Sequence, residues 1–272
     1  MRTTVENLYR NANYSYSELV SLLIYGFIIG FIFSYNKWGI NGIYNRSIGL
    51  QNLLLYTIAS IFVIFLFTYL QKIIGVFVGV HTSSHITWLF LVISILLCFV
   101  TAGKIIIFIP PTLNIKQEEH LMIGRKPFAL SIKNLRVFAL LPILCLTLLG
   151  VLFSNVIPLA HPVSSALFWV CFLTALYSLI PVEILINVPL LFAKEKAEIV
   201  VADTMTHKVE TRGASLGSIL LFGSRMNLAF ALVFLLCSLI SQVTTGFIFT
   251  VLFSFFIALF ATIVYFTKTE LS

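Results

Sequence analysis

The sequence predicts an all-α polytopic membrane protein with six to seven transmembrane helices. Of its 272 residues, 60% are hydrophobic and 10% are charged, and the mean hydropathy is +1.05. Soluble domains contain about 45–50% apolar and about 25% charged residues, so this chain lacks the polar side chains to cover a water-exposed surface. The apolar residues also gather into stretches that approach the length of about 20 residues needed to cross a bilayer. A soluble enzyme, a disordered chain and a coiled coil are thereby excluded.

The candidate spans follow a polar N-terminal segment, residues 1–18, and form with their connections a single transmembrane domain over residues 19–272. The first span has no small-residue cleavage pattern after it, so we interpret it as a retained helix and not as a signal peptide. The second apolar stretch can run on through Val80. The last two are so close that they form either a tight hairpin or one span plus a re-entrant piece. The stretches are Leu19–Tyr35, Leu53–Leu70, Ile86–Ala102, Val137–Ile157, Val163–Ile186, Leu228–Ser241 and Gly246–Phe266.

Two segments differ from an apolar helix, and we expect short strand-like or re-entrant elements there. Residues 104–111 (KIIIFIPP) form a β-branched run that ends in two prolines, which is typical of a strand or a re-entrant segment. Residues 198–212 (EIVVADTMTHKVETR) alternate loosely between apolar and polar and include the only aspartate, Asp203. This second segment is predicted to be an interfacial strand or hairpin.

The distribution of basic residues predicts how the chain is oriented in the membrane. With seven spans, the long connections 103–136 and 187–227 lie on one side, and this side, which also includes Lys37, Arg46 and Lys268, carries 14 of the 17 Lys and Arg residues. Because cytoplasmic loops carry an excess of Lys and Arg, the N-terminus is expected outside and the C-terminus in the cytoplasm. Basic residues scattered singly through such loops are typical of membrane topology. We therefore expect contact with membrane lipids and no nucleic-acid partner.

His81 and His85 are candidate metal ligands. On a helix, their spacing of four residues would place both imidazoles on one face, as in the zinc motif HExxH. The glutamate of that motif is the general base, and Thr82 stands in its place, where it cannot take a proton from zinc-bound water. A third ligand, Glu183 or His161, would also be needed. The alternative is a polar turn between two spans that carries two titratable histidines.

Glu183 is the only acidic residue within a predicted span and is the candidate catalytic carboxylate. A charge at the bilayer centre costs about 2.5 kcal/mol or more, so this side chain must pair, line a wet cavity or stay protonated. Pro181 and Pro189 break the helix nearby, which favours a position at the cytoplasmic interface. Both alternatives stay open for Glu183.

Small residues within the spans are interpreted as packing residues. The four cysteines each lie in an apolar run without paired spacing, so neither a disulfide framework nor a cysteine metal site is implied. Gly26 and Gly30 are four residues apart, as are Gly75 and Gly79, and this spacing lets transmembrane helices approach closely. Packing within the chain is favoured over dimerisation.

The order of these elements resembles that of the site-2 protease family of intramembrane zinc metalloproteases over residues 15–190. That family has early spans, a HExxH helix, a hairpin-like insertion, an AGPxxN stretch and an LDG motif after an NLLP-like turn. The best match of the layout places HExxH on residues 71–75. Gln71 and Gly75 then replace the two histidines, and Lys72 replaces the glutamate.

The same register places the later motifs of the family on residues that match them poorly. The AGPxxN stretch falls on Ala129–Asn134, where only the first and last residues agree, and the residues Ser178–Pro181 resemble the NLLP turn. The metal-binding aspartate of the LDG motif falls on Ile186. Moving the histidines of HExxH onto His81 and His85 restores two ligands but not the glutamate. The resemblance therefore implies a degenerate member that kept the scaffold and lost the zinc.

We therefore expect a non-catalytic membrane protein, either pseudoprotease-like or an accessory subunit that binds other integral membrane proteins through its spans. No cofactor is expected in that case. The first alternative is an intramembrane zinc metalloprotease that uses His81, His85 and a third ligand. The second alternative is a proton-coupled transporter of small solutes, in which Glu183 is the carrier carboxylate beside the helix break at Pro181.

Overall fold

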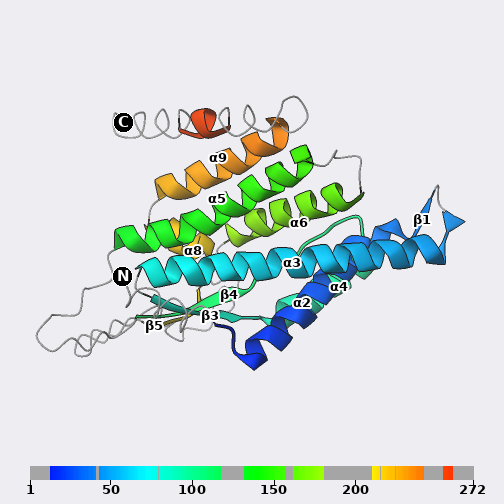
Figure 1. Ribbon diagram of the computed structural model, residues 1–272, viewed down its shortest axis with the longest axis horizontal. Coiled ribbons are helices and arrows are strands. Elements are labelled where there is room, and N and C mark those ends of the chain that lie inside the picture. Colours follow the sequence, from blue (N-terminus) through cyan, green and yellow to red (C-terminus); the bar gives the residue numbers. More distant parts are fainter. Residues whose placement is uncertain are drawn as a thin grey trace, which may run out of the picture.

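The computed structural model describes most of the chain, and over the described residues the protein is mostly helical (Figure 1). Seven α-helices and two small antiparallel sheets are found there. Three segments, Tyr16–Lys37, Arg46–Val78 and Val137–Ser154, are long and apolar enough to cross a membrane, and shorter apolar helices accompany them. The chain is therefore a multi-pass integral membrane protein. The described residues are 13–40, 43–78, 80–117, 132–156, 162–180, 210–214, 216–223, 225–241 and 254–259.

The first two helices form an antiparallel pair joined by a small hairpin. Helix α2 spans Tyr16–Ser34 and helix α3 spans Arg46–Val78. A Cβ atom on Gly30 would lie 2.4 Å from Cα of Thr57, so the two backbones touch where the side chain is missing. The predicted packing role of this glycine is confirmed. The connection contains the 3-10 turn η1 (Tyr35–Lys37) and the strands β1 (Gly39–Ile40) and β2 (Ile43–Tyr44).

Helix α3 is longer than the apolar stretch Leu53–Leu70 on which its prediction rested. It has 33 residues and ends at Val78, so the second apolar stretch does continue beyond Leu70 but not through Val80, which begins the strand that follows. At 1.5 Å per residue it is about 50 Å long, whereas the hydrocarbon layer is about 30 Å thick. Arg46 and Lys72 are 26 residues, or about 39 Å, apart along this helix, which is more than that thickness.

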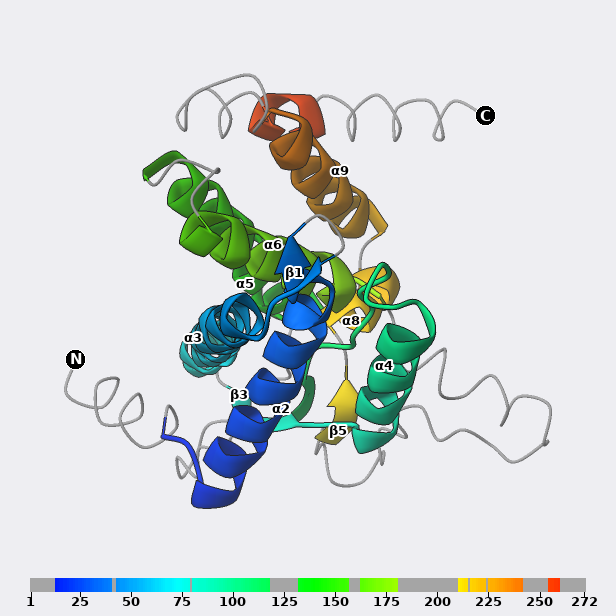
Figure 2. The same ribbon diagram turned by 90° about the vertical axis from the view of Figure 1, so that its right-hand side faces the viewer.

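A three-stranded sheet lies at one end of the helices (Figures 1 and 2). Strand β3 (Val80–His85) directly follows α3 and pairs antiparallel with β4 (Thr112–Gln117), which pairs antiparallel with β5 (Glu210–Ala214). The order is β3-β4-β5, so segments separated by about 100 residues in the chain meet in one sheet. We call this the sheet end of the molecule, and the opposite end, which carries β1 and β2, the hairpin end.

Helix α4 (Trp88–Val100) leaves the sheet, and an extended segment returns to it. The turn after the helix uses left-handed backbone at Ala102 (φ 51°) and Gly103 (φ 72°). A Cβ on Gly103 would lie 2.9 Å from Cδ1 of Tyr35, which places this turn beside the far end of α2. The chain therefore runs the full length of α2 and comes back as residues 104–111.

The strand expected at 104–111 begins later than predicted. These residues are extended but belong to no sheet, and pairing begins only at Thr112. Proline has no backbone N–H to donate to a neighbouring strand, so Pro110 and Pro111 delay the start of β4. The second expected strand, 198–212, is represented by its last residues in β5, and its residues 198–209 lie outside the described residues.

The pairing of β3 with β4 contradicts the arrangement of loops predicted from seven helical spans. That arrangement placed the loop holding His81 on one side and the connection 103–136 on the other. The register pairs His81 with Lys116 and His85 with Thr112, so the two segments lie at the same end. The prediction was wrong because hydropathy cannot show that an extended segment, residues 104–111, leads back from the end of α4 to the sheet.

The second half of the described chain adds four helices, of which α5 and α6 pack on α3, and α8 and α9 pack on α5. Their bounds broadly agree with the predicted spans, but α8 lies within the predicted polar connection 187–227 and was not expected. Of the seventh predicted span, only residues 254–259 are described, and they are helical. The four helices are α5 (Ile132–Val156), α6 (Pro162–Ser178), α8 (Leu216–Gly223) and α9 (Arg225–Ser241).

Candidate functional site

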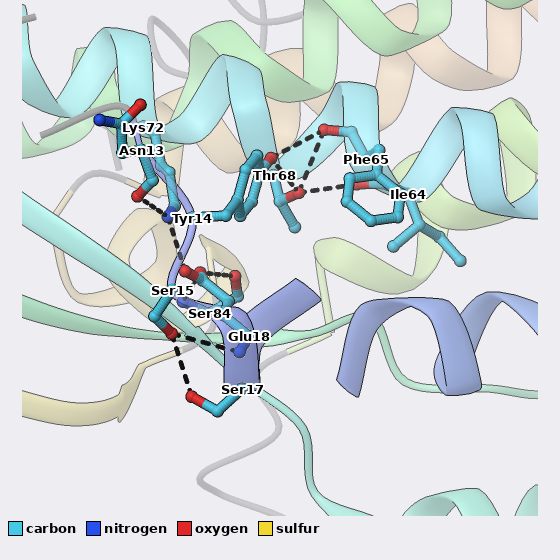
Figure 3. Close-up of polar contacts among 10 residues, drawn as sticks. All are labelled: Asn13, Tyr14, Ser15, Ser17, Glu18, Ile64, Phe65, Thr68, Lys72 and Ser84. Carbon is cyan, nitrogen blue, oxygen red and sulfur yellow. Dashed lines mark hydrogen bonds and ion pairs between the residues drawn. The ribbon is translucent and has the colours of Figure 1, made fainter. Parts of the chain in front are cut away.

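A buried ion pair connects α2 and α3 at the sheet end (Figure 3). The Nζ atom of Lys72 lies 2.7 Å from Oε2 of Glu18, and the two side chains are 3% and 8% exposed. Lys72 also donates to the backbone carbonyl of Asn13 at 3.0 Å. A buried charge is tolerated when it is paired and hydrogen-bonded, and both partners meet that condition here.

The carboxylate of Glu18 also contacts the sheet. Its Oε1 accepts a hydrogen bond from the backbone N–H of Ser84 at 2.8 Å and a second one from the Ser84 hydroxyl. Strand β3, which carries Ser84, is an edge strand of its sheet. Exposed N–H groups on an edge strand invite pairing with another chain, so Glu18 covers part of that edge. One carboxylate thereby joins α2, α3 and β3.

Tyr14 closes the cluster on the side away from the sheet. The Nζ of Lys72 lies 4.0 Å from the centre of the Tyr14 ring, within the range of a cation–π interaction. The Tyr14 hydroxyl donates to the carbonyl of Phe65 at 3.1 Å and lies 2.9 Å from Oγ1 of Thr68. Burial raises the pKa of Tyr14 to about 12, so its hydroxyl stays protonated and neutral beside the ion pair.

A small cavity adjoins the residue before Lys72. Gln71 is 1% exposed, and neither its amide nitrogen nor its amide oxygen has a hydrogen-bond partner within the described part of the chain. The cavity, of about 10 Å³, has room for about one water molecule. Helices α3, α6 and α8 and the extended segment meet there. The lining residues are Phe67, Gln71, Pro110, Pro111, Tyr177, Ser178 and Leu216.

Two tyrosines hold the extended segment 104–111 inside the helices. The hydroxyl of Tyr25 donates to the carbonyl of Ile109 at 2.6 Å, and that of Tyr177 donates to the carbonyl of Ile106 at 2.5 Å. Non-helical backbone is tolerated at membrane depth only where its polar groups find partners inside the protein. Tyr25 on α2 and Tyr177 on α6 supply such partners for two carbonyls of this segment.

The candidate zinc ligands His81 and His85 lie on β3 and not on a helix. Four residues along a strand span about 13 Å, whereas the same spacing along a helix is about 6 Å. The helical spacing on which the zinc interpretation depended is therefore absent. Among the described residues, no three His, Cys, Asp or Glu side chains come close enough to hold a metal.

The remaining sequence candidates are placed only in part. Glu183 and His161 lie outside the described residues, and so does Ile186. Cys98 and Cys171 are buried, and Cys145 and Cys237 are half-buried.

The residues that the resemblance assigns to zinc do not suit this metal. Zinc sites in proteins use imidazole, thiolate and carboxylate groups. Gln71 offers a neutral amide, Gly75 offers no side chain, and Lys72 carries an ammonium group that repels a cation. Ser178, which the resemblance assigns to the start of the NLLP-like turn, lines the same cavity as Gln71.

Sequence reasoning missed the Glu18–Lys72 pair, although a signal was present. Lys72 follows a long apolar run, and Glu18 directly precedes another. A lysine so placed on a transmembrane helix needs a counter-charge, and Glu18 was available near the start of the first span. That pairing was not considered, because Glu18 was placed in the polar N-terminal segment and Lys72 lay beyond the second predicted span, Leu53–Leu70.

No protein-family model, no curated protein and no solved structure matches this chain. Its function must therefore be inferred from the chemistry of the residues described above.

Proposed function

We propose that this chain is a non-catalytic multi-pass membrane protein, an accessory subunit that binds other integral membrane proteins. In this proposal it keeps a scaffold resembling that of site-2 proteases without the catalytic groups. The observation that carries the proposal is the state of Lys72, which stands where that family has its general base. Its ammonium group is bound to Glu18 at 2.7 Å.

Neither member of the ion pair is free to transfer a proton. A general base must accept a proton from a reacting group, and Glu18 already accepts hydrogen bonds from Lys72 and twice from Ser84. Lys72 is held by Glu18, by the Asn13 carbonyl and by the Tyr14 ring. The cluster is therefore suited to fixing the helices in place, which is what a scaffold requires.

Helix α4 offers the surface through which another membrane protein would be bound. One of its faces carries large apolar side chains at least 42% exposed, and this face meets either lipid chains or another helix in a bilayer. Its length of 13 residues, about 20 Å, is less than the thickness of the hydrocarbon layer. The exposed residues are Trp88, Leu89, Val92, Ile93, Leu96, Phe99 and Val100.

Purification in a mild detergent tests this proposal. We expect a second integral membrane protein to co-purify at fixed stoichiometry and the zinc content to stay well below one ion per chain. The variant Leu96→Ala should weaken that association, and Tyr16→Ala, which changes an exposed residue outside α4, should not.

Two results would support the alternatives. Stoichiometric zinc that is lost in the variant His81→Ala would favour the metalloprotease. A chain that purifies alone and whose reconstituted solute uptake loses its pH dependence in the variant Glu183→Gln would favour the transporter. Either result would overturn the proposed role.

A further inference from the structure

We infer that the sheet end of this protein faces the cytoplasm and that the hairpin end faces the opposite side of the membrane. This reverses the orientation expected for the N-terminus, α2 and α3, and it keeps the long basic connections on the cytoplasmic side. The inference begins at the sheet, where His85 of β3 pairs with Thr112 of β4. The 26 residues between them therefore leave one end of the molecule and return to it.

The excursion between β3 and β4 reaches the far end of the helices before it turns. Gly103 lies beside Tyr35, at the end of α2, whereas Ser84 lies beside Glu18, at its start. These two levels are 17 residues apart along α2, or about 26 Å, which is most of the hydrocarbon thickness. Residues 86–103, which include α4, therefore cover this depth in one direction, and residues 104–111 cover it in the other.

The return of the chain changes which connections share a side. Strand β4 and the start of α5 both lie at the sheet end, as do the end of α6 and strand β5 (Figure 1). The connection between β4 and α5, and that between α6 and β5, therefore begin and end at the sheet end. The segment before Tyr16 also joins α2 at this end, where Glu18 binds Ser84.

Of the nine basic residues that the structure describes, six lie at the sheet end. Lys37, Arg46 and Lys104 lie at the hairpin end. Lys and Arg in connections shorter than about 60 residues determine orientation, whereas Asp and Glu contribute little. The acidic residues Glu18 and Glu210 also lie at the sheet end, and they do not reverse this conclusion. The six basic residues are Lys72, Lys116, Lys133, Arg136, Arg212 and Arg225.

Labelling of introduced cysteines in intact cells tests this orientation. His85→Cys on β3 and Asn114→Cys on β4 report on the sheet end, while Tyr44→Cys on β2 and Lys104→Cys report on the hairpin end. Each variant is treated with a membrane-impermeant maleimide before and after the cells are permeabilised. The unsubstituted chain gives the background from its four own cysteines, and labelling after permeabilisation shows that each variant is present.

We expect Tyr44→Cys and Lys104→Cys to be labelled in intact cells, and His85→Cys and Asn114→Cys to be labelled at least tenfold more strongly after permeabilisation. The reverse pattern would overturn the orientation. Labelling of His85→Cys and Asn114→Cys from opposite sides would overturn the return of the chain. Labelling of all four in intact cells would show that the two ends do not lie across the membrane.

Discussion

The Nζ atom of Lys72 lies 2.7 Å from Oε2 of Glu18, and 54 residues separate these two partners in the chain. The pair joins the first turn of α2 to the last turns of α3, and the contact of Glu18 with Ser84 adds β3. Because both charges are buried, the two residues depend on each other. Replacing Glu18 and Lys72 singly and together therefore measures their interaction.

Replacing one partner of the ion pair should destabilise the protein strongly. Glu18→Gln leaves the Lys72 ammonium buried without a counter-charge, and such a loss costs about 3–5 kcal/mol. Lys72→Met leaves the Glu18 carboxylate buried without a counter-charge, at a similar cost. The double variant Glu18→Gln with Lys72→Met should lose less free energy of unfolding than the sum of the two single losses.

Unfolding in detergent by sodium dodecyl sulfate, followed by circular dichroism, measures these differences. Ser17→Ala, on an exposed neighbouring position, is the matched control and should change the free energy of unfolding by less than about 0.5 kcal/mol. Additive single losses would contradict a direct interaction between the two charges.

The hydroxyl groups of Tyr25 and Tyr177, which bond the extended segment 104–111, should contribute to the free energy of unfolding. Tyr25→Phe removes the donor to the Ile109 carbonyl and leaves that carbonyl buried, which costs about 1–3 kcal/mol. Tyr177→Phe should act in the same way on Ile106. The same unfolding measurement applies, with Tyr16→Phe as the control because Tyr16 is 84% exposed. Equal stability of Tyr25→Phe and the unsubstituted chain would show that the hydrogen bond to Ile109 contributes nothing.

Gln71 should be replaceable by an apolar residue of similar size. Its amide is buried and has no partner among the described residues, so Gln71→Met removes an unfavourable burial and should leave stability unchanged or raise it by up to about 1 kcal/mol. Thermal unfolding in detergent compares it with Lys72→Met, which makes the same side chain one position later. A loss above about 1 kcal/mol would show that Gln71 binds a hydrogen-bonding partner in the cavity.

Gly30 should not tolerate a side chain. The Cβ of Gly30→Ala would lie 2.4 Å from Cα of Thr57, so α2 and α3 would have to move apart at a cost of about 1–3 kcal/mol. Leu23→Ala, on an exposed position of the same helix, is the control. Loss of stability confined to Gly30→Ala in the detergent unfolding assay is the expected result, and an unaffected Gly30→Ala would contradict the close packing.

Much of the helical fold was predictable because a transmembrane helix leaves a local signal. The apolar runs beginning at Leu19 and Leu53 correspond to α2 and α3, and the packing of Gly30 followed from its spacing to Gly26. Helix α8 was missed because its eight residues are too few to stand out within the connection 187–227.

The candidate site was harder to predict because its parts are distant in the chain. The cavity is lined by Gln71 on α3 and Ser178 on α6, and no sequence pattern indicates that these two residues lie close together. The histidine spacing was misleading for the opposite reason. His81 and His85 satisfy a helical motif, but pairing with β4 holds them in an extended strand, where that spacing has a different geometry.

The sequence by itself determined that this is a multi-pass membrane protein and where its apolar segments lie, because hydropathy depends only on neighbouring residues. Tertiary structure decided that Lys72 is a buried, paired charge and that β3 and β4 share one end of the molecule. Both depend on contacts between distant segments. Sheet pairing and the hydrogen bonds from Tyr25 and Tyr177 allow an extended segment to return among the helices. Counting apolar stretches in the sequence does not detect such a segment.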